Sequence, residues 1–395
     1  MRQKPLLMGL TALAVVSDAM LLPFYPQFFA ERFGVNDPQH VGAYLAAMCL
    51  TVMFALPLWA RLVRHMPLLQ LLVFTQLAAG LLCLYCYWTT SLAGFWLLSL
   101  AMIAFKGSYL LVYPYLIGLS EEGEHAATVG LLSVIVHFGG IAGALLGGLL
   151  LQGADGGQVF LLMAAGDALQ IAICLYLLWR QPLAALTPAA KPAVATAVAT
   201  GGDDGGRLRR VYRLAGLMLL FYFSAYLVRA FFALHWQAVS GIGDSRLAAA
   251  VFALPALLAL AGLWHNRQRA HRGLEPLGSL PVMLLIGTAG LLLQALPDAA
   301  LLLLGRCLFG WAMFQLTVQL DVQLFRLGTA QSYAADYSKI NFCQNLGVLA
   351  ASYAAGALVA GQGLAMPFLV AAAGFVLTAL LYPLLAVTPR KLVTA

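Results

Sequence analysis

Long apolar segments recur along the whole chain and are separated by short polar ones. They lie near residues 5–30, 40–60, 67–88, 93–118, 126–150, 158–179, 214–239, 247–264, 277–296, 299–320, 335–360 and 366–387. A helix that crosses a bilayer needs about 20 predominantly apolar residues, and most of these segments are close to that length. The pattern predicts twelve membrane-spanning helices and an all-α integral membrane protein.

The central connection divides these segments into two sets of six. Residues 181–213 contain three prolines, many alanines, the run Gly-Gly-Asp-Asp-Gly-Gly and then a basic cluster. This composition is typical of a flexible linker. We therefore expect an N-terminal six-helix bundle over residues 1–180, a cytoplasmic linker over 181–213 and a C-terminal six-helix bundle over 214–395.

Composition narrows the class of protein. Hydrophobic residues make up 62% of the chain and charged residues 9%, whereas an ordinary soluble domain is about 45–50% apolar and about 25% charged. Such a chain cannot cover itself with a surface compatible with water. A soluble enzyme, a disordered protein and a nucleic-acid-binding module are therefore excluded, and we expect no nucleic-acid partner despite the net charge of +7.

The lysines and arginines between the apolar segments predict the orientation. If both termini lie in the cytoplasm, sixteen of these cations fall on the cytoplasmic side and only Arg32 and Arg246 on the other. Cytoplasmic loops of membrane proteins carry such an excess. The sequence thus predicts a multi-pass protein with cytoplasmic termini, and its alanine-rich spans and short loops favour the bacterial inner (cytoplasmic) membrane.

Few features point to cofactor chemistry. All six cysteines fall inside apolar segments, and Cys83-x-x-Cys86 has no second pair and no polar ligands beside it, so packing is the expected role. The chain has no phosphate-binding loop of the type G-x-x-x-x-G-K-[ST]. Its connections are too short for a catalytic domain, and no nucleophile, base or metal set is clustered. We expect no cofactor, no metal and no enzymatic activity.

Three local motifs stand within the predicted spans. Residues 139–148 read Gly-Gly-Ile-Ala-Gly-Ala-Leu-Leu-Gly-Gly, a spacing of small residues that lets two helices approach closely. The glycines of interest there are Gly139, Gly143, Gly147 and Gly148. Asp18 precedes Pro23 in the first span, and Arg306 begins an R-x-x-x-G pattern in the tenth.

This layout and these motifs resemble the major facilitator superfamily. Residues 139–148 are similar to the antiporter motif G-x-x-x-G-P-x-x-G-G, with Ala144 in place of the proline, and Asp18 is similar to an acidic residue in helix 1 of drug/proton antiporters. The loop at 57–65 keeps the cations of the family's loop motif but lacks its aspartate. The resemblance implies two pseudo-symmetric six-helix bundles and a cavity lined by helices 1, 4, 7 and 10. It favours the proton-coupled exporters of drugs and metabolites, siderophores included.

Ionisable groups inside the spans are functional candidates, because a charge at the bilayer centre costs about 3 kcal/mol on insertion scales. Asp18 lies within the hydrocarbon thickness, where desolvation favours the neutral carboxyl, so we predict that it carries the coupled proton. The alternative is a fixed ion-pair partner. His137, in the middle of the fifth span, is a second proton-coupling candidate because histidine titrates near neutral pH, with a packing hydrogen bond as the alternative.

Three cations lie on the helices that the resemblance places around the cavity: Lys106, Arg229 and Arg306. Such groups suit a substrate that carries carboxylates, which arginine binds through two parallel hydrogen bonds. Polar and aromatic side chains near them complete the predicted substrate site, namely Tyr109, Tyr113, Tyr222, Tyr226 and Gln315. The alternative is that each cation pairs with a carboxylate of the protein, such as Asp18, Asp167 or Asp321.

A last charged group stands near the inner ends of the tenth and eleventh spans. Asp336 and Lys339 are three residues apart, on one face of a helix. Together with Asp321 they are predicted to form an inner gate and not a substrate site.

These residues favour a secondary transporter that works by alternating access. We expect it to export a small organic anion or zwitterion, for example a carboxylate siderophore, in exchange for protons. Two alternatives stay open: a proton-coupled importer of an organic anion, and a multidrug efflux pump of broad specificity. The expected partners are the small-molecule substrate, protons and the lipid bilayer, and we expect a monomer.

Overall fold

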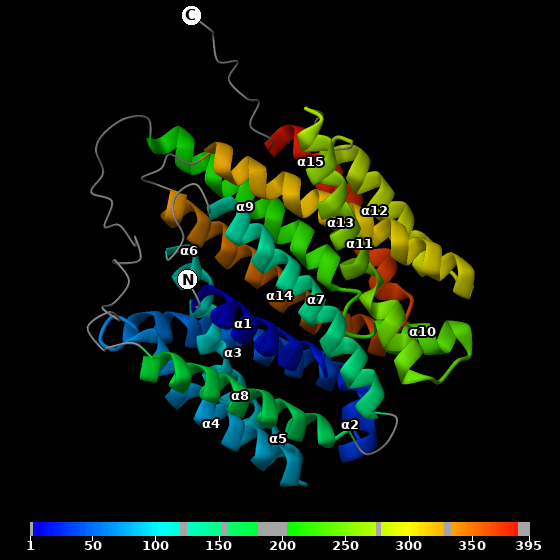
Figure 1. The fold of residues 1–395 in the computed structure, drawn as a ribbon. Helices are drawn as coiled ribbons and strands as arrows, with labels where there is room; N and C mark the ends of the chain where they lie inside the picture. The colour runs from blue at the N-terminus through cyan, green and yellow to red at the C-terminus, as the bar shows by residue number, and fades with distance from the viewer. Residues whose placement is uncertain are drawn as a thin grey trace, which may run out of the picture.

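The computed structural model describes residues 3–118, 125–151, 156–180, 204–273, 278–327 and 333–385. Within these ranges every regular element is a helix, and the helices pack side by side (Figure 1). They are α1 (Gln3–Ala19), α2 (Tyr25–Phe33), α3 (Pro38–Leu62), α4 (Leu68–Trp88), α5 (Leu92–Lys106), the 3-10 helix η1 (Gly107–Leu111), α6 (Val112–Gly118), α7 (His125–Leu151), α8 (Gln158–Arg180), α9 (Asp204–Tyr226), α10 (Phe232–Ser240), α11 (Ser245–His271), α12 (Leu280–Gln294), α13 (Ala299–Leu327), α14 (Tyr333–Gln362) and α15 (Met366–Leu385). The predicted all-α fold is confirmed.

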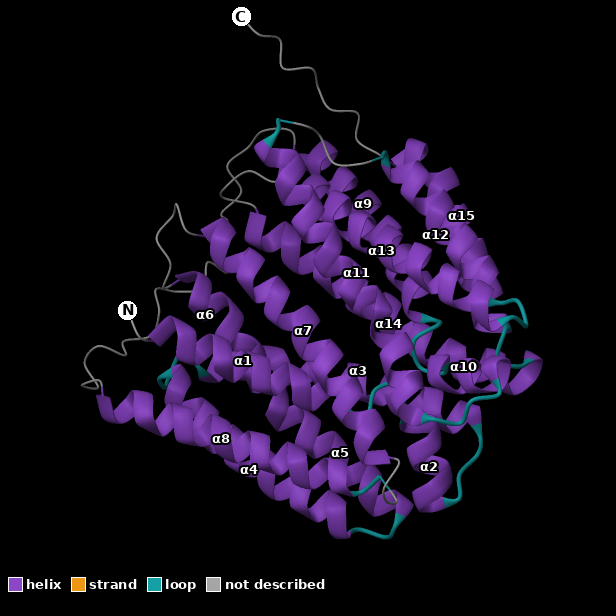
Figure 2. Ribbon diagram, turned by 45° about the vertical axis from the view of Figure 1, so that its right-hand side comes forward, coloured by secondary structure: helices purple, strands orange, loops and turns teal. Residues whose placement is uncertain are grey.

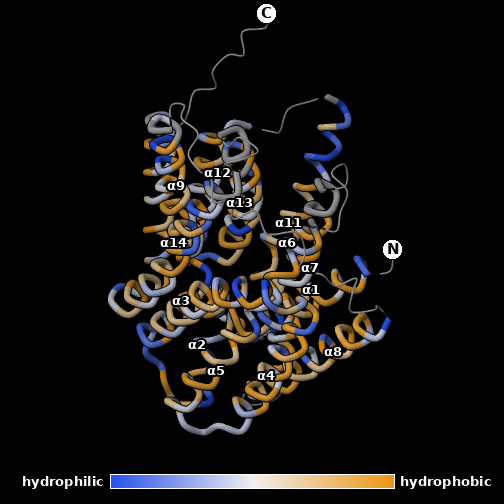
Figure 3. Tube along the Cα trace, turned by 90° about the vertical axis from the view of Figure 1, so that its left-hand side faces the viewer, coloured by the Kyte–Doolittle hydropathy of each residue, from blue (hydrophilic) through white to orange (hydrophobic). Residues whose placement is uncertain are grey.

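The helices form twelve passes through the bundle. In the described ranges nine spans are long and apolar enough to cross a membrane, and α12 is a shorter apolar helix. One of the nine, Leu92–Leu116, combines α5, η1 and α6. The two remaining passes each consist of two helices, α1 with α2 and α9 with α10. Hydrophobic positions run along every pass (Figure 3), and exposed apolar side chains such as Leu97, at 74%, suit contact with lipid tails.

The first pass is interrupted, although the apolar segment at 5–30 predicts one continuous helix. α1 ends at Ala19 and α2 begins at Tyr25. Pro23 lies between them, and its missing backbone N–H cannot continue an α-helix. The chain therefore changes direction one residue after Asp18.

The seventh pass has the same interruption. α9 ends at Tyr226 and α10 begins at Phe232, although neither proline nor glycine stands between them. The residues that directly precede the two short helices have nearly the same backbone angles, with φ −118° and ψ 5° at Phe24 and φ −109° and ψ 11° at Phe231. The break is therefore a shared feature of the two halves, and in the second half it forms without proline.

The turns that follow these short helices also match. α2 ends at Gly34 with φ 67°, and α10 ends at Gly241 with φ 69°; this left-handed conformation costs other residues about 1–2 kcal/mol. α3 and α11 begin after Asp37 and Asp244, and each aspartate accepts a hydrogen bond from the backbone N–H two residues further on. The two halves thus repeat one another in detail, as expected for pseudo-symmetric bundles.

The two halves are in contact at the end of the molecule where α2 is followed by α3 and α10 is followed by α11. We call this the turn end, and we call the opposite end, where α1 begins, the terminal end. α2 and α10 lie at the same end of the molecule (Figure 2), and Gln27 Nε2 donates to Gln237 Oε1 across 2.6 Å. A Cβ added to Gly42 on α3 would lie 2.9 Å from the Cα of Gly356 on α14. These contacts hold the halves together at the turn end.

The last part of the expected linker is helical. α9 starts at Asp204, inside the segment 181–213 expected to be a linker. Residues 181–203 lie outside the described ranges, so the linker expectation is addressed only for its last ten residues, which are helical.

Candidate functional site

Asp18 lies at the break of the first pass. The residue is exposed. The hydroxyl of Tyr109, on η1, is a hydrogen-bond partner of the Asp18 carboxyl, and Lys106 and Asp167 interact with that carboxyl electrostatically. The proton-coupling candidate therefore belongs to a cluster that contains one cation and a second acid.

Lys106 is ion-paired with that second acid. Its Nζ lies 2.7 Å from Asp167 Oδ1 on α8, and the two side chains are 6% and 0% exposed. Gln170 Nε2 donates to the same oxygen at 3.4 Å, and the Cys83 thiol on α4 donates to Asp167 Oδ2 at 3.5 Å. This geometry corresponds to the alternative in which the cation pairs within the protein, and a substrate contact for Lys106 stays a prediction.

The glycines of residues 139–148 divide between two neighbouring helices. Those that face α1 are Gly139, Gly143 and Gly147. An added Cβ on Gly143 would overlap the backbone oxygen of Val16, and one on Gly147 would overlap that of Met20. A Cβ on Gly148 would lie 2.6 Å from the backbone oxygen of Ser245, at the start of α11 in the other half. The stripe thus supports the part of α1 that carries Asp18.

The two predicted cations of the second half have no carboxylate partner among the described residues. Arg306, on α13, is 4% exposed; its Nη2 donates to the backbone oxygen of Phe252 at 2.9 Å, while its Nε is buried without a partner. Its Cζ lies 3.7 Å from the centroid of the Phe232 ring, a cation–π contact.

Arg229 is close to Arg306. It stands within the break between α9 and α10, is half-buried, and lies over the Tyr226 ring with its Cζ 5.3 Å from the centroid. The two guanidinium groups are near enough to repel each other electrostatically. The second half thus holds two like charges that no described carboxylate neutralises.

The remaining predicted substrate residues are spread over both halves. Tyr222 and Tyr226 are stacked, with ring centroids 5.8 Å apart, beside Arg229. Tyr113 on α6 is 37% exposed. Gln315 is fully buried, and its amide exchanges two hydrogen bonds of 3.0 Å with Asn266 on α11. The Gln315 amide is therefore satisfied within the protein, whereas the Tyr226 ring contacts the uncompensated Arg229.

The predicted gate is visible only in part. Lys339 Nζ lies 3.7 Å from Asp336 Oδ1 on the same face of α14, whereas the side chain of Asp321 lies outside what the structure describes. His137, the second proton-coupling candidate, donates from Nδ1 to the backbone oxygen of Ser133 at 2.7 Å. That bond is the packing interaction named as its alternative, and a proton-coupling role for His137 stays a prediction.

Several neighbours of these charges were not singled out from the sequence as site residues. They are Cys83 and Gln170 beside Asp167, Phe232 and Phe252 around Arg306, and Asn266 beside Gln315. Apart from the Cys83-x-x-Cys86 spacing, no motif in the sequence marks them. Gln170 lies three residues after Asp167 on α8, whereas the packing of separate helices brings the other four to the charged groups.

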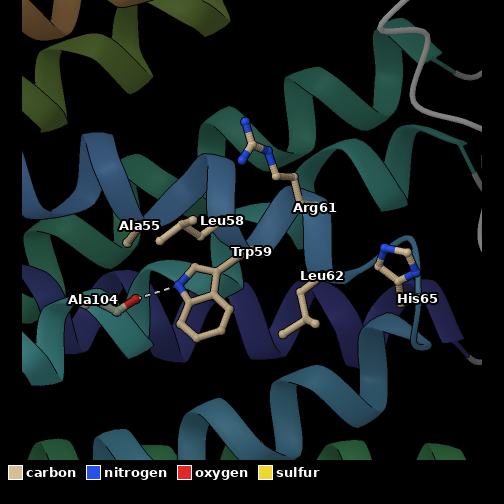
Figure 4. A pocket seen from close by; sticks show the side chains of 7 residues that line it. All are labelled: Ala55, Leu58, Trp59, Arg61, Leu62, His65 and Ala104. Carbon is tan, nitrogen blue, oxygen red and sulfur yellow. Dashed lines mark hydrogen bonds between the residues drawn. The ribbon is translucent and has the colours of Figure 1, made fainter.

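A groove of about 380 Å³ opens on the surface of α3, apart from this cluster. Figure 4 shows its lining, in which Trp59 Nε1 donates to the backbone oxygen of Ala104 on α5 at 2.7 Å. Leu58 and Leu62 are exposed there, at 60% and 39%. The lining is mostly apolar and includes none of the predicted substrate residues, so the groove is not the candidate site.

Comparisons with known proteins agree with this fold. The family model of the Major Facilitator Superfamily matches residues 7–335, and no curated protein matches the chain in sequence. A bacterial homologue of the human lysosomal transporter Spinster, in an inward-facing and occupied conformation, is 14% identical with a TM-score of 0.72, over 98% of each chain. An auto-inhibited peptide transporter of the POT family is 15% identical with a TM-score of 0.77, over 99% of this chain and 98% of that one. The human organic anion transporter MFSD10 (TETRAN) is 16% identical with a TM-score of 0.69, over 96% of this chain and 98% of that one.

Proposed function

The chain belongs to the Major Facilitator Superfamily, and we propose that it exports a small organic anion or zwitterion in exchange for protons. It is a multi-pass membrane protein and a secondary transporter, not an enzyme. The proposal concerns the substrate class, the direction and the coupling ion. A carboxylate siderophore is one substrate of this class.

The uncompensated charge of Arg229 and Arg306 carries the proposal. Two guanidinium groups that repel each other inside a membrane protein are stabilised when an anion binds, because charges interact strongly in a medium of low polarity. Arg229 is the accessible member of the pair, beside the stacked Tyr222 and Tyr226. A carboxylate of the substrate would accept hydrogen bonds from Arg229 and rest against the two rings. The organic anion transporter that shares the fold is compatible with this substrate class.

The first half would supply the proton coupling. Asp18 is exposed and is adjacent to the break of the first pass, so a change in its charge acts where the helix bends. The carboxyl can exchange a proton with solvent, whereas Asp167 is enclosed and already holds Lys106. In this proposal Asp18 binds a proton from one side of the membrane and releases it to the other.

The proposal also covers the orientation in the membrane, the oligomeric state and the conformation. We propose that both termini face the cytoplasm of a bacterial cell and that the protein acts as a monomer in the inner membrane. The turn end, closed by Gln27–Gln237 and by the contact of Gly42 with Gly356, would then be the outer end. In this proposal the structure is the state that opens toward the cytoplasm.

The test is substrate-dependent proton movement in proteoliposomes that contain a pH-sensitive dye, with wild type compared with Asp18→Asn. The panel contains carboxylate metabolites, a citrate-type siderophore and cationic drugs. We expect proton flux with one or more carboxylates and none in Asp18→Asn, while substrate counterflow persists in that variant. Proton flux only with cationic drugs would replace the proposal by multidrug efflux. Carboxylate counterflow without any proton flux would overturn proton coupling.

A further inference from the structure

The cluster behind Asp18 holds one cation between two acids. Titratable groups from three other elements face Lys106: Asp18 from α1, Cys83 from α4 and Asp167 from α8. Asp18 also interacts with Tyr109 from η1 and Tyr25 from α2. When both aspartates are ionised and Lys106 is charged, the cluster carries a net negative charge. A buried net charge is unfavourable, so one proton on an aspartate neutralises the cluster.

The surroundings of the two acids decide which one takes the proton. Asp167 is 0% exposed and its oxygens accept from Lys106, Gln170 and Cys83, three donors that favour a carboxylate. Asp18 has the Tyr109 hydroxyl as its hydrogen-bond partner and is accessible. The exchangeable proton therefore belongs on Asp18, and the observed position of Lys106 on Asp167 is the arrangement that suits a protonated Asp18.

We propose that Asp167 is a positioning residue for the proton cycle: it holds Lys106 while Asp18 is protonated and yields Lys106 to Asp18 when that proton leaves. The only bond that breaks is the O–H bond of the Asp18 carboxyl, whose proton passes to solvent. Lys106 stays an ammonium group throughout. This inference rests on the proposed proton-coupled transport.

Two features of the structure allow Lys106 to change partner. Lys106 carries its charge on a flexible four-carbon chain, and it already interacts with both carboxylates. Asp167 keeps two other donors, Gln170 and Cys83, after Lys106 departs, so its charge is not left without hydrogen bonds. The exchange would occur at the junction of α5 with the 3-10 helix η1 and beside the break after Ala19. A change of partner therefore acts on the first and fourth passes together.

Infrared spectroscopy of the protein in lipid vesicles tests the exchange without any substrate. The carbonyl band of the protonated Asp18 is identified by its loss in Asp18→Asn, and its intensity is followed as the pH is changed. The decisive variant is the neutral double substitution Lys106→Gln with Asp167→Asn. If Lys106 moves to the ionised Asp18, the double variant loses that stabilisation. The proton concentration at which Asp18 is half protonated is then about tenfold or more lower in the double variant than in wild type.

If Lys106 instead stays on Asp167, the protonation midpoint of Asp18 should not change, because the double variant then removes only a neutral ion pair. A midpoint unchanged from wild type would overturn the proposal. Asp167→Asn alone, which leaves Lys106 to Asp18, is expected to displace the midpoint the opposite way, to a proton concentration about tenfold higher. Asp167→Glu keeps the negative charge and is expected to give the wild-type midpoint. This variant is the control for folding, because a misfolded protein would not recover that midpoint.

The same measurement separates this inference from the proposed function. If the Asp18 band titrates and shifts as expected but no carboxylate moves protons in the dye assay, the proton site stands and the transport proposal fails. If carboxylates drive proton flux but the double variant leaves the midpoint unchanged, the transport proposal stands and the exchange of Lys106 is wrong.

Discussion

The break between α1 and α2 and the break between α9 and α10 have the same backbone and opposite charges. Phe24 corresponds to Phe231, and Gly34 corresponds to Gly241. With this alignment of the two halves, Asp18 is equivalent in position to Ala225, and Arg229 is equivalent in position to Leu22. Each half therefore has one ionisable group at its break, an acid in the first half and a cation in the second.

The buried cations that stand behind the two breaks differ in the same way. Lys106 is held by a carboxylate, Asp167. Arg306 is held by the Phe252 carbonyl and the Phe232 ring, which balance none of its charge. The group at the first break has two acids, Asp18 and Asp167, and one cation, Lys106, whereas the group at the second break has two cations, Arg229 and Arg306, and no described carboxylate partner. A shared backbone thus supports two electrostatic environments, one suited to a proton and one to an anion.

The support of the first broken pass by the glycine stripe gives the largest expected effect. Gly143→Leu would force a side chain into the backbone of α1 at Val16, and we expect it to reduce transport to background because overpacked helices must separate. Gly140→Leu is the matched control, since a Cβ there meets nothing within 4 Å. Transport in proteoliposomes and the amount of protein inserted into the membrane are measured for both. Normal transport in Gly143→Leu would contradict a fixed role for the glycine stripe.

If the first half binds the proton and the second half binds the anion, a substitution at the second break should change KM and not the pH dependence of transport. Arg229→Gln removes a charged hydrogen-bond donor worth about 1.5–3 kcal/mol, so we expect KM for a carboxylate substrate to rise about 10- to 100-fold. The pH at half-maximal transport is expected to stay near the wild-type value. Arg246→Gln, an exposed cation at the turn end, is the control and should change neither. A shift in the pH profile without a change in KM would assign Arg229 to proton coupling.

The symmetry of the backbone itself predicts the smallest effect. Gly34→Ala and Gly241→Ala place a Cβ in open space but at φ 67° and 69°, so each should lower the free energy of unfolding by about 1–2 kcal/mol. Thermal unfolding of the purified protein should give nearly equal losses for the two variants. Clearly unequal losses would show that the matching turns are not equivalent in stability.

Part of the charged site follows from the sequence. Lys106, Arg229 and Arg306 stand out because charges are rare in apolar spans, and pairing within the protein was among the alternatives for each. The sequence does not show which of these cations forms an ion pair. Asp167 is far from Lys106 in the chain and reaches it only through the packing of α8 against the neighbouring helices. For Arg306 the same packing supplies aromatic rings in place of an acid.

The breaks show where local sequence signals end. Pro23 marks the first interruption, but residues 227–231 contain neither proline nor glycine, so the second interruption is imposed by the fold around it. The glycines at 139, 143 and 147 indicated a close helix contact, and the structure identifies its partner as α1. A spacing of small residues sets how near a neighbour can lie, not which neighbour it is.

The sequence by itself determined that this protein is a bundle of apolar helices in a membrane, because the length and polarity of each segment fix how it partitions between lipid and water. The resemblance of its layout and motifs pointed to the family to which it belongs. The tertiary structure decided which charges are neutralised, because electrostatic compensation depends on distances between helices that the chain order does not encode. Asp167 on Lys106 and Phe232 on Arg306 are the two contacts that make the halves different.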